Sequence, residues 1–252
     1  MPRYKLTVAY EGTNFHGWQK QEPREKPPLR TAQGVLERVV SGVVREPVIL
    51  TGASRTDSGV HAVGQVAAFS TSREIPIERL PRAITARCPS DLQVHSAELV
   101  GEAFDPISDA VRKQYGYTIQ HGRVTPPLFD RRTIWRTHHD LDPELMKQGA
   151  QLLKGTHDFE AFANASHGRE STTRKIEKCE VIEITQNKLR IDVVGGGFLY
   201  NMVRIIAGSL HEIGRGARVP ESITEAITHT DRTLTGPTLG PEGLCLEWIE
   251  YP

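Results

Sequence analysis

Residues 179–214, CEVIEITQNKLRIDVVGGGFLYNMVRIIAGSLHEIG, contain the strongest folding signals in this chain. In the first half of the segment, apolar and polar residues alternate on both sides of Gln186 and Asn187. This alternation is typical of two half-buried strands joined by a turn. After a run of glycines the period becomes helical over residues 198–213, with one apolar stripe from Leu199 to Ile213. The segment therefore predicts an antiparallel hairpin followed by a helix.

The elements on either side of this segment complete a repeated order. The first half predicts strands over 4–10, 48–50, 64–70 and 92–100, with helices after Thr31 and over 76–88. The second half predicts strands over 111–120 and 243–251 around the hairpin, and helices over 140–154, 198–213 and 220–229. Both halves follow the order β-α-β-β-α-β, which predicts an α+β fold with helices on one face of antiparallel sheets. We expect two ferredoxin-like domains, residues 1–104 and 105–252.

The composition limits the protein class. The chain has 252 residues, and its 31 Lys and Arg residues balance 31 Asp and Glu residues. This balance excludes a globally basic nucleic-acid coat, so any contact with RNA would need local basic patches. Three distant cysteines form no disulfide framework and no thiolate zinc site, which favours a reducing compartment. Without a signal peptide or a long apolar run, we expect a cytoplasmic protein that does not span a membrane.

Residues 51–62, TGASRTDSGVHA, are the best candidate for chemistry. A predicted strand ends there, and the following turn holds Arg55, Asp57 and His61 within seven residues. Turns at strand ends often display reactive groups on a rigid scaffold, and a carboxylate can act as a nucleophile or a base. The simpler interpretation is an Asx turn formed by Asp57 ahead of Gly59. On these residues alone, both interpretations stay open.

Several other chemistries are excluded by motifs that the chain lacks. The sequence contains no GxxxxGK[ST], HExxH or GxSxG pattern. The histidines are scattered, and the adjacent His138 and His139 cannot share a helix face as ligands. We therefore expect no metal site.

Six segments, in order along nearly the whole chain, resemble the motifs of the tRNA pseudouridine synthase A family. The segment TGASRTDSGVHAVGQVAAF is similar to the family's active-site segment, and RKQYGYTI to the strand with its active-site tyrosine. The other four are YEGTNFHGWQKQ, GTHDFEAF, GGGFLYNMVRIIAGSLHEIGRG and GLCLEWIEY. The resemblance implies a pseudouridine synthase fold with a central cleft. It also implies an isomerase that needs no cofactor or metal and converts uridine to pseudouridine in tRNA.

The resemblance further implies roles for individual residues. Asp57 matches the catalytic aspartate, Arg55 the arginine before it, Tyr115 the active-site tyrosine, Arg204 a basic partner of the aspartate, and Leu244 with Leu246 a hydrophobic wall. We expect Tyr115 to stack on the target uracil. We expect Arg55 to hold a phosphate or to support the flipped-out nucleotide. Core packing explains Leu244 and Leu246 equally well.

The expected partners follow from the same resemblance. Members of the family are homodimers that act on uridines 38–40 in the anticodon arm of tRNA. Three local basic clusters are candidates for contacts with phosphates, although each could equally be a solvated face. They are Arg131 with Arg132 and Arg136, Arg169 with Arg174, Lys175 and Lys178, and Arg215 with Arg218.

Two other functions remain as alternatives. A non-catalytic tRNA-binding or tRNA-folding module on the same fold would keep the basic clusters and Tyr115 but would not need Asp57. An unrelated aspartyl enzyme acting on a small molecule is disfavoured by the missing cofactor and metal motifs.

Overall fold

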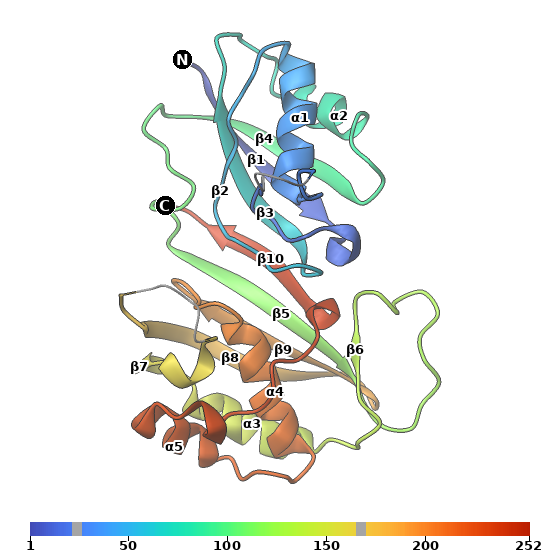
Figure 1. The fold of residues 1–252 in the computed structure, drawn as a ribbon, viewed down its shortest axis with the longest axis vertical. Coiled ribbons are helices and arrows are strands. Elements are labelled where there is room, and N and C mark those ends of the chain that lie inside the picture. The colour runs from blue at the N-terminus through green and yellow to red at the C-terminus, as the bar shows by residue number, and fades with distance from the viewer. Residues whose placement is uncertain (22–26, 165–169) are drawn as a thin grey trace. The chain divides into compact units, whose positions relative to one another are not determined.

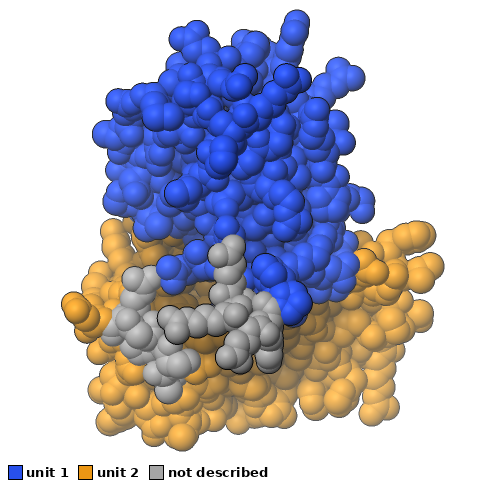
Figure 2. All heavy atoms as spheres, turned by 45° about the horizontal axis from the view of Figure 1, so that its top comes forward, with its two compact units in different colours: residues 1–111, 246–252 blue, residues 112–245 orange. Residues whose placement is uncertain are grey.

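The computed structural model describes residues 1–21, 27–164 and 170–252. It divides into two compact units, residues 1–111 with 246–252 and residues 112–245 (Figure 2). Both units combine antiparallel strands with helices, so the predicted α+β class is confirmed. The two compact units follow from packing within the structure, whereas the two domains were predicted from the repeated order of elements in the sequence. The predicted domain boundary after residue 104 therefore stays a prediction.

Unit 1 is a sheet covered by two helices. Its strands lie in the order β4-β1-β3, with β2 and the C-terminal part of β10 next to β3. Helices α1 and α2 lie over one face of the sheet (Figure 1). The elements are β1 Arg3–Tyr10, α1 Ala32–Val44, β2 Thr51–Gly52, β3 His61–Ser70, α2 Leu80–Thr85, β4 Leu92–Val100 and β10 Leu244–Glu250.

The sequence explains the first elements of unit 1 directly. Burial alternates along β1, where Tyr4, Leu6 and Val8 are buried, because successive strand residues face opposite sides of a sheet. Helix α1 begins after Thr31, whose hydroxyl accepts a hydrogen bond from the Gly34 amide.

Unit 2 has a sheet of four antiparallel strands in the order β5-β9-β8-β7, and the short β6 pairs in parallel with β5. Helices α3 and α4 pack against each other, and α5 contacts α3. The strands are β5 Arg112–Gln120, β6 Trp135–Arg136, β7 Gly155–Asp158, β8 Thr173–Thr185 and β9 Lys188–Gly195. The helices are α3 Pro143–Leu152, α4 Met202–Gly214 and α5 Ser222–His229.

The predicted hairpin is confirmed. Strands β8 and β9 pair in antiparallel fashion around Gln186 and Asn187, with Thr185 opposite Lys188. The predicted start of the following helix at residue 198 is wrong, because α4 begins at Met202. Asn201 has a φ of 62°, a left-handed conformation that a helix cannot continue through.

Other predicted boundaries are also wrong, among them those of the helix expected over 76–88, which spans only Leu80–Thr85. The short strand expected over 48–50 is displaced to Thr51–Gly52, because the backbone amide of Leu50 donates to the side chain of Glu37 instead of to a strand. The helix expected from residue 140 begins at Pro143, where the Asp142 carboxylate accepts hydrogen bonds from the amides of Glu144 and Leu145.

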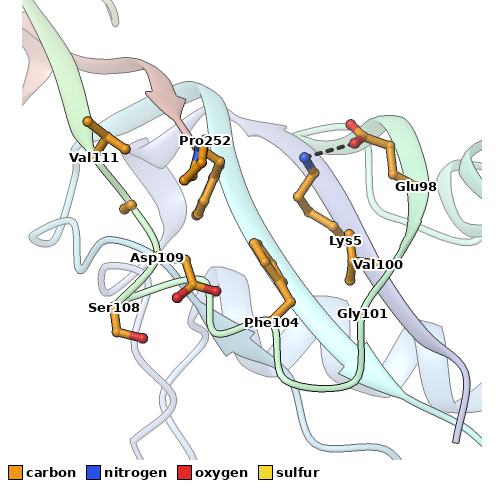
Figure 3. Close-up of a pocket in the computed structure, with 11 residues that line it drawn as sticks. Lys5, Glu98, Val100, Gly101, Phe104, Ser108, Asp109, Val111 and Pro252 are labelled. Atoms are coloured by element: carbon orange, nitrogen blue, oxygen red, sulfur yellow. Dashed lines mark ion pairs between the residues drawn. The ribbon is translucent and has the colours of Figure 1, made fainter.

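The C-terminal residues of the chain pack within unit 1. The Tyr251 hydroxyl donates to the Pro106 carbonyl at 2.8 Å, and its ring lies 5.1 Å from that of Phe104. Both rings line a pocket of about 690 Å³ in which Lys5 forms an ion pair with Glu98 at 2.8 Å (Figure 3). No helix among the described residues is both long and apolar enough to cross a membrane.

Candidate active site

The loop that carries Asp57 connects β2 to β3, and buried contacts hold its first residues. The Ala53 amide donates to the Val66 carbonyl at 2.8 Å. The fully buried Gln65 side chain donates to the Ser54 carbonyl at 2.6 Å and accepts from the Ser54 amide at 3.2 Å. A buried amide satisfied in this way fixes the backbone that it contacts. The loop therefore leaves the sheet in one defined direction.

The second part of the loop is a tight turn that begins at Asp57. The Val60 amide donates to the Asp57 carbonyl at 3.1 Å, and Gly59 has a φ of 81°, which glycine adopts without strain. The Gly59 amide and the Ser58 hydroxyl both donate to the Phe15 carbonyl, at 3.2 and 3.3 Å. These hydrogen bonds hold the backbone at and after Asp57, whose side chain is half-buried.

The N-terminal motif, residues 10–21, packs against this loop. The hydroxyls of Tyr10 and Thr56 form a buried hydrogen bond of 2.7 Å, and the Trp18 amide donates to the Thr56 carbonyl at 3.0 Å. Gly17 has a φ of 80°, and a Cβ atom there would lie 2.6 Å from the Thr56 carbonyl oxygen. Two motifs far apart in the sequence are therefore parts of one framework around Asp57.

His61 belongs to that framework. It is buried, and its Nδ1 accepts a hydrogen bond from the Gly12 amide at 3.0 Å. Because an amide can only donate, Nδ1 carries no proton and the neutral ring has its proton on Nε2. His61 therefore joins the N-terminal motif to the start of β3.

Arg55 lies two residues before Asp57 in the same loop of unit 1. The Arg55 side chain is exposed, whereas that of Asp57 is half-buried. The other predicted site residues, Tyr115, Arg204 and Leu244, belong to unit 2.

Tyr115 lies in the middle of β5, opposite Val193 of β9. Tyr115 is 5% exposed. The rings of Tyr115 and Phe198 form an edge-to-face pair with their centroids 5.4 Å apart. Aromatic pairs favour this edge-to-face arrangement, and the contact with Phe198 therefore orients the Tyr115 ring.

Tyr117, two residues along the same strand, is a fully buried core residue. Its hydroxyl donates to the Gly240 carbonyl at 2.7 Å. Burial raises the pKa of Tyr117 far above its usual value, the Glu242 carboxylate raises it further, and the Arg204 guanidinium opposes them. Tyr117 therefore remains protonated and fixes the segment before β10.

Arg204 lies in the first turn of α4 and is half-buried. Its Nε donates to the Leu239 carbonyl at 2.7 Å, and one terminal nitrogen donates to the Asn201 side-chain oxygen at 2.9 Å. Both acceptors are neutral, so these two contacts orient the guanidinium group without neutralising its charge.

Leu244 and Leu246 lie at the start of β10. They are 5% and 0% exposed, which agrees with core packing. A role for Leu244 in substrate binding stays a prediction.

The sequence analysis missed the residues that hold the loop. Gln65 and Thr56 are buried polar residues whose hydrogen bonds fix the backbone on both sides of Arg55. The signal for Gln65 was present, because it is the polar residue within the apolar strand segment GQVAAF. Among the described residues, no group of three or more His, Cys, Asp or Glu side chains could hold a metal ion.

Two of the three basic clusters contain ion pairs within the protein. Lys175 and Lys178 form ion pairs with Glu177 and Glu180, at 3.5 and 2.9 Å. Arg169, which was assigned to the same cluster, lies outside the described residues. In the third cluster, Arg215 forms an ion pair with Glu212, and Arg218 donates to the carbonyls of Leu234 and Thr233.

In the first cluster, Arg131 and Arg136 contact neutral groups. Arg131 donates to the Leu128 carbonyl at 2.7 Å. Arg136 donates to the Gln120 side-chain oxygen at 3.2 Å and to the Val124 carbonyl at 3.5 Å. These acceptors are neutral, so the contacts position the two guanidinium groups and leave their charge unchanged.

Comparison with known proteins agrees with the motifs. The family model described as tRNA pseudouridine synthase matches residues 6–107 and 150–252. A tRNA pseudouridine synthase A from Moorella thermoacetica is 40% identical over 253 residues, covering 100% of both chains. A tRNA pseudouridine synthase A 2 from Clostridium perfringens is 39% identical over 251 residues, again with 100% of both chains covered. The resemblance inferred from the six motifs is therefore confirmed, and the chain belongs to the tRNA pseudouridine synthase family.

Proposed function

We propose that this tRNA pseudouridine synthase modifies uridines 38–40 in the anticodon arm and that Asp57 is its catalytic carboxylate. The observation that supports Asp57 best is the rigid framework around it. Buried hydrogen bonds from Gln65 and Tyr10 hold the loop before Asp57, and a backbone turn closed by Val60 follows it. A reacting group must be held in this way, because small displacements cost large factors in rate.

The reaction rearranges bonds within one nucleotide. The bond between ribose C1′ and uracil N1 breaks, the uracil rotates, and a new bond joins C1′ to C5. The proton on C5 is lost to solvent or a base, and N1 gains a proton, so no oxidant or reductant is consumed. In this scheme Asp57 acts either as the nucleophile or as a base at the ribose 2′ position.

The other predicted site residues have complementary roles in the proposal. The Tyr115 ring stacks on the uracil, since an aromatic face accepts the base before and after rotation. Arg204 supplies a permanent cation that keeps a desolvated carboxylate ionised. Arg55 holds a phosphate or supports the nucleotide after it has left the base stack, a step that costs a few kcal/mol.

The proposal also includes the setting in which the enzyme works. We infer a homodimer that binds one tRNA with both subunits, as the family resemblance implies, and a cytoplasmic location. Sedimentation of the purified protein tests the first inference.

Release of tritium from tRNA labelled at uridine C5 tests the proposed activity. The label leaves only when the base is rejoined through C5, so wild-type protein should release it and Asp57→Ala should not. Affinity for tRNA should change by no more than a few-fold in the variant, since Asp57 is proposed to act in the chemical step. Mapping the pseudouridines in the product tRNA then tests positions 38–40.

Two outcomes would contradict the proposal. Substantial turnover by Asp57→Ala would remove the catalytic role of that carboxylate. Binding of tRNA by wild-type protein with no release from any tRNA would favour the alternative, a non-catalytic tRNA-binding module.

A further inference from the structure

The segment between β5 and β6, residues 122–134, forms a long loop that we call the arm (Figure 1). Its central residues include the most exposed large apolar side chain among the described residues, Phe129, which is 91% exposed. The neighbouring Leu128 is 69% exposed, and Pro126, two residues before Leu128, is also exposed. A single exposed apolar residue is ordinary, but several close together in the middle of one loop indicate a contact surface.

The ends of the arm are fixed to the core of unit 2. Strand β6 pairs with β5 through Ile119 opposite Trp135, and the Trp135 ring contacts the His211 ring at 5.1 Å. At the other end His121 is buried, and the Gly122 amide donates to the His139 carbonyl at 2.9 Å. The arm therefore begins and ends at defined positions.

Hydrogen bonds within the arm also hold its exposed end. The Arg131 contact with the Leu128 carbonyl spans Phe129, and the Thr133 amide donates to the Asp130 carbonyl at 2.9 Å. Lys188 of β9 forms an ion pair with Asp130 at 3.1 Å. The exposure of Phe129 is thus a property of an organised loop, and binding would not require this loop to order first.

The charge on the arm identifies the kind of partner. The arm and Arg136, two residues beyond it, contain four arginines and a single acidic residue, Asp130. That aspartate is already paired with Lys188, whereas Arg131 and Arg136 donate hydrogen bonds to neutral oxygens. A second copy of this chain would bring the same positive surface against itself, which is unfavourable. An aromatic side chain among arginines suits a polyanion with exposed bases.

We propose that the arm binds tRNA, with the Phe129 ring stacked on an unpaired base and the arginines beside it contacting phosphates. The proposal rests on tRNA being the substrate, and it assigns to the arm a contact outside the chemistry at Asp57. Because every base has an aromatic face, Phe129 would add affinity without reading sequence. The arginines would add the salt-dependent part of binding.

Equilibrium binding of unmodified tRNA, together with tritium-release kinetics, tests this proposal in three variants. Phe129→Ala should weaken tRNA binding and raise KM by about 5- to 50-fold, since stacking of one base has about this effect. Its kcat at saturating tRNA should stay within about twofold of wild type. Phe129→Trp keeps an aromatic face and should bind like wild type. Ile107→Ala is the matched control, because Ile107 is 59% exposed in unit 1, outside the arm.

Salt dependence separates stacking from charge. Arg123→Gln should lower the slope of log affinity against log salt by about 0.7–0.9, the contribution of one phosphate contact, whereas Phe129→Ala should leave the slope unchanged. Thermal unfolding of each variant verifies that the fold is intact.

The outcomes distinguish this proposal from the proposed function. If wild-type protein releases tritium and Phe129→Ala binds tRNA with wild-type affinity, the arm proposal is wrong while the enzyme stands. If Phe129→Ala instead converts a dimer to a monomer in sedimentation, the arm is an interface between copies and the proposal is again overturned. If wild-type protein neither binds nor modifies tRNA, the proposed function itself fails.

Discussion

The loop around Asp57 and the arm around Phe129 are both connections between strands, yet they are held in opposite ways. The loop around Asp57 is fixed by buried groups, among them Gln65 and the hydroxyl pair of Tyr10 and Thr56. The arm is fixed by hydrogen bonds and an ion pair at the surface, and its apolar residues Leu128 and Phe129 face solvent. The first arrangement suits a reacting group whose position must not change. The second suits a surface that meets a large partner.

This difference in burial predicts a difference in sensitivity. Buried hydrogen bonds are costly to lose because the groups left behind are desolvated, whereas surface ion pairs contribute about 0–1 kcal/mol. If Asp57 acts as proposed, changes in the framework of its loop should therefore affect both stability and kcat. Changes in the arm should affect mainly the affinity for tRNA.

The largest effect is expected from removing the positive charge of Arg204, which the proposed carboxylate chemistry requires. Arg204→Ala should lower kcat by about 10²–10³-fold, the loss typical of removing one group that stabilises charge in an active site. Arg204→Lys keeps the cation and should retain more of the rate. Single-turnover tritium release measures both variants. Wild-type rates in both would show that Arg204 has no part in the reaction.

The next effect concerns the packing between the N-terminal motif and the loop. In Gly17→Ala a Cβ atom would lie 2.6 Å from the Thr56 carbonyl oxygen, at a φ of 80° that alanine rarely adopts. The free energy of unfolding should fall by about 1–3 kcal/mol, and kcat should fall because the loop must move. Urea denaturation and tritium release measure the two quantities.

Gly42→Ala is the matched control for Gly17→Ala. Gly42 lies in α1, and a Cβ atom there would have no neighbour within 4 Å. Because alanine favours a helix, this variant should be more stable by about 0.5–1 kcal/mol and fully active. Equal destabilisation of both glycine variants would contradict the framework described for the loop.

A smaller effect, dependent on pH, is expected at the base of the arm. Burial lowers the pKa of His121, and the carboxylates of Asp140 and Glu183 oppose this only in part. The unfolded chain, with an ordinary His pKa of about 6.5, then binds more protons than the folded protein as the pH falls. The contribution of neutral His121 to stability is therefore fully present above a pH of about 6.5, and it should be lost as the pH falls from there through the lower pKa of His121 in the folded protein.

Replacement by a residue that does not titrate isolates this contribution. Among the described residues, neither ring nitrogen of His121 has a hydrogen-bond partner, so His121→Phe loses no such contact. Urea denaturation at pH 7.5 and pH 5.5 should show a smaller decline in the variant than in wild type. Some decline should remain, because burial also lowers the pKa of His211. An unchanged decline would mean that His121 does not contribute.

The smallest effect is expected at the surface of the arm. Asp130→Asn removes the ion pair with Lys188, whose two side chains are 55% and 28% exposed, and keeps the backbone turn. The free energy of unfolding should change by less than about 1 kcal/mol. Affinity for tRNA should rise slightly, since a negative charge is lost from a basic surface. A large loss of stability would show that the arm is held as firmly as the loop around Asp57.

Local patterns in the chain were enough to predict much of this protein. The alternation along β1, β8 and β9 and the turn at Gln186 and Asn187 were visible in the sequence, because strand pairing over a short turn depends on neighbouring residues. The six ordered motifs identified the family, and the turn that carries Arg55 and Asp57 was visible as well. These features depend on residue types at short spacing.

Only the tertiary structure decided how distant segments support that turn. No local pattern links Gln65 to Ser54, Tyr10 to Thr56 or Gly17 to the loop, because these contacts arise when strands and motifs separated in the chain pack together. The start of α4 at Met202 likewise depends on the left-handed conformation of Asn201. Folding also decides which charges are matched: Lys178 forms an ion pair with Glu180, whereas Arg131 and Arg136 donate hydrogen bonds to neutral oxygens. Composition fixes how many charges and aromatic rings a chain has, but their exposure depends on what the folded chain places next to them.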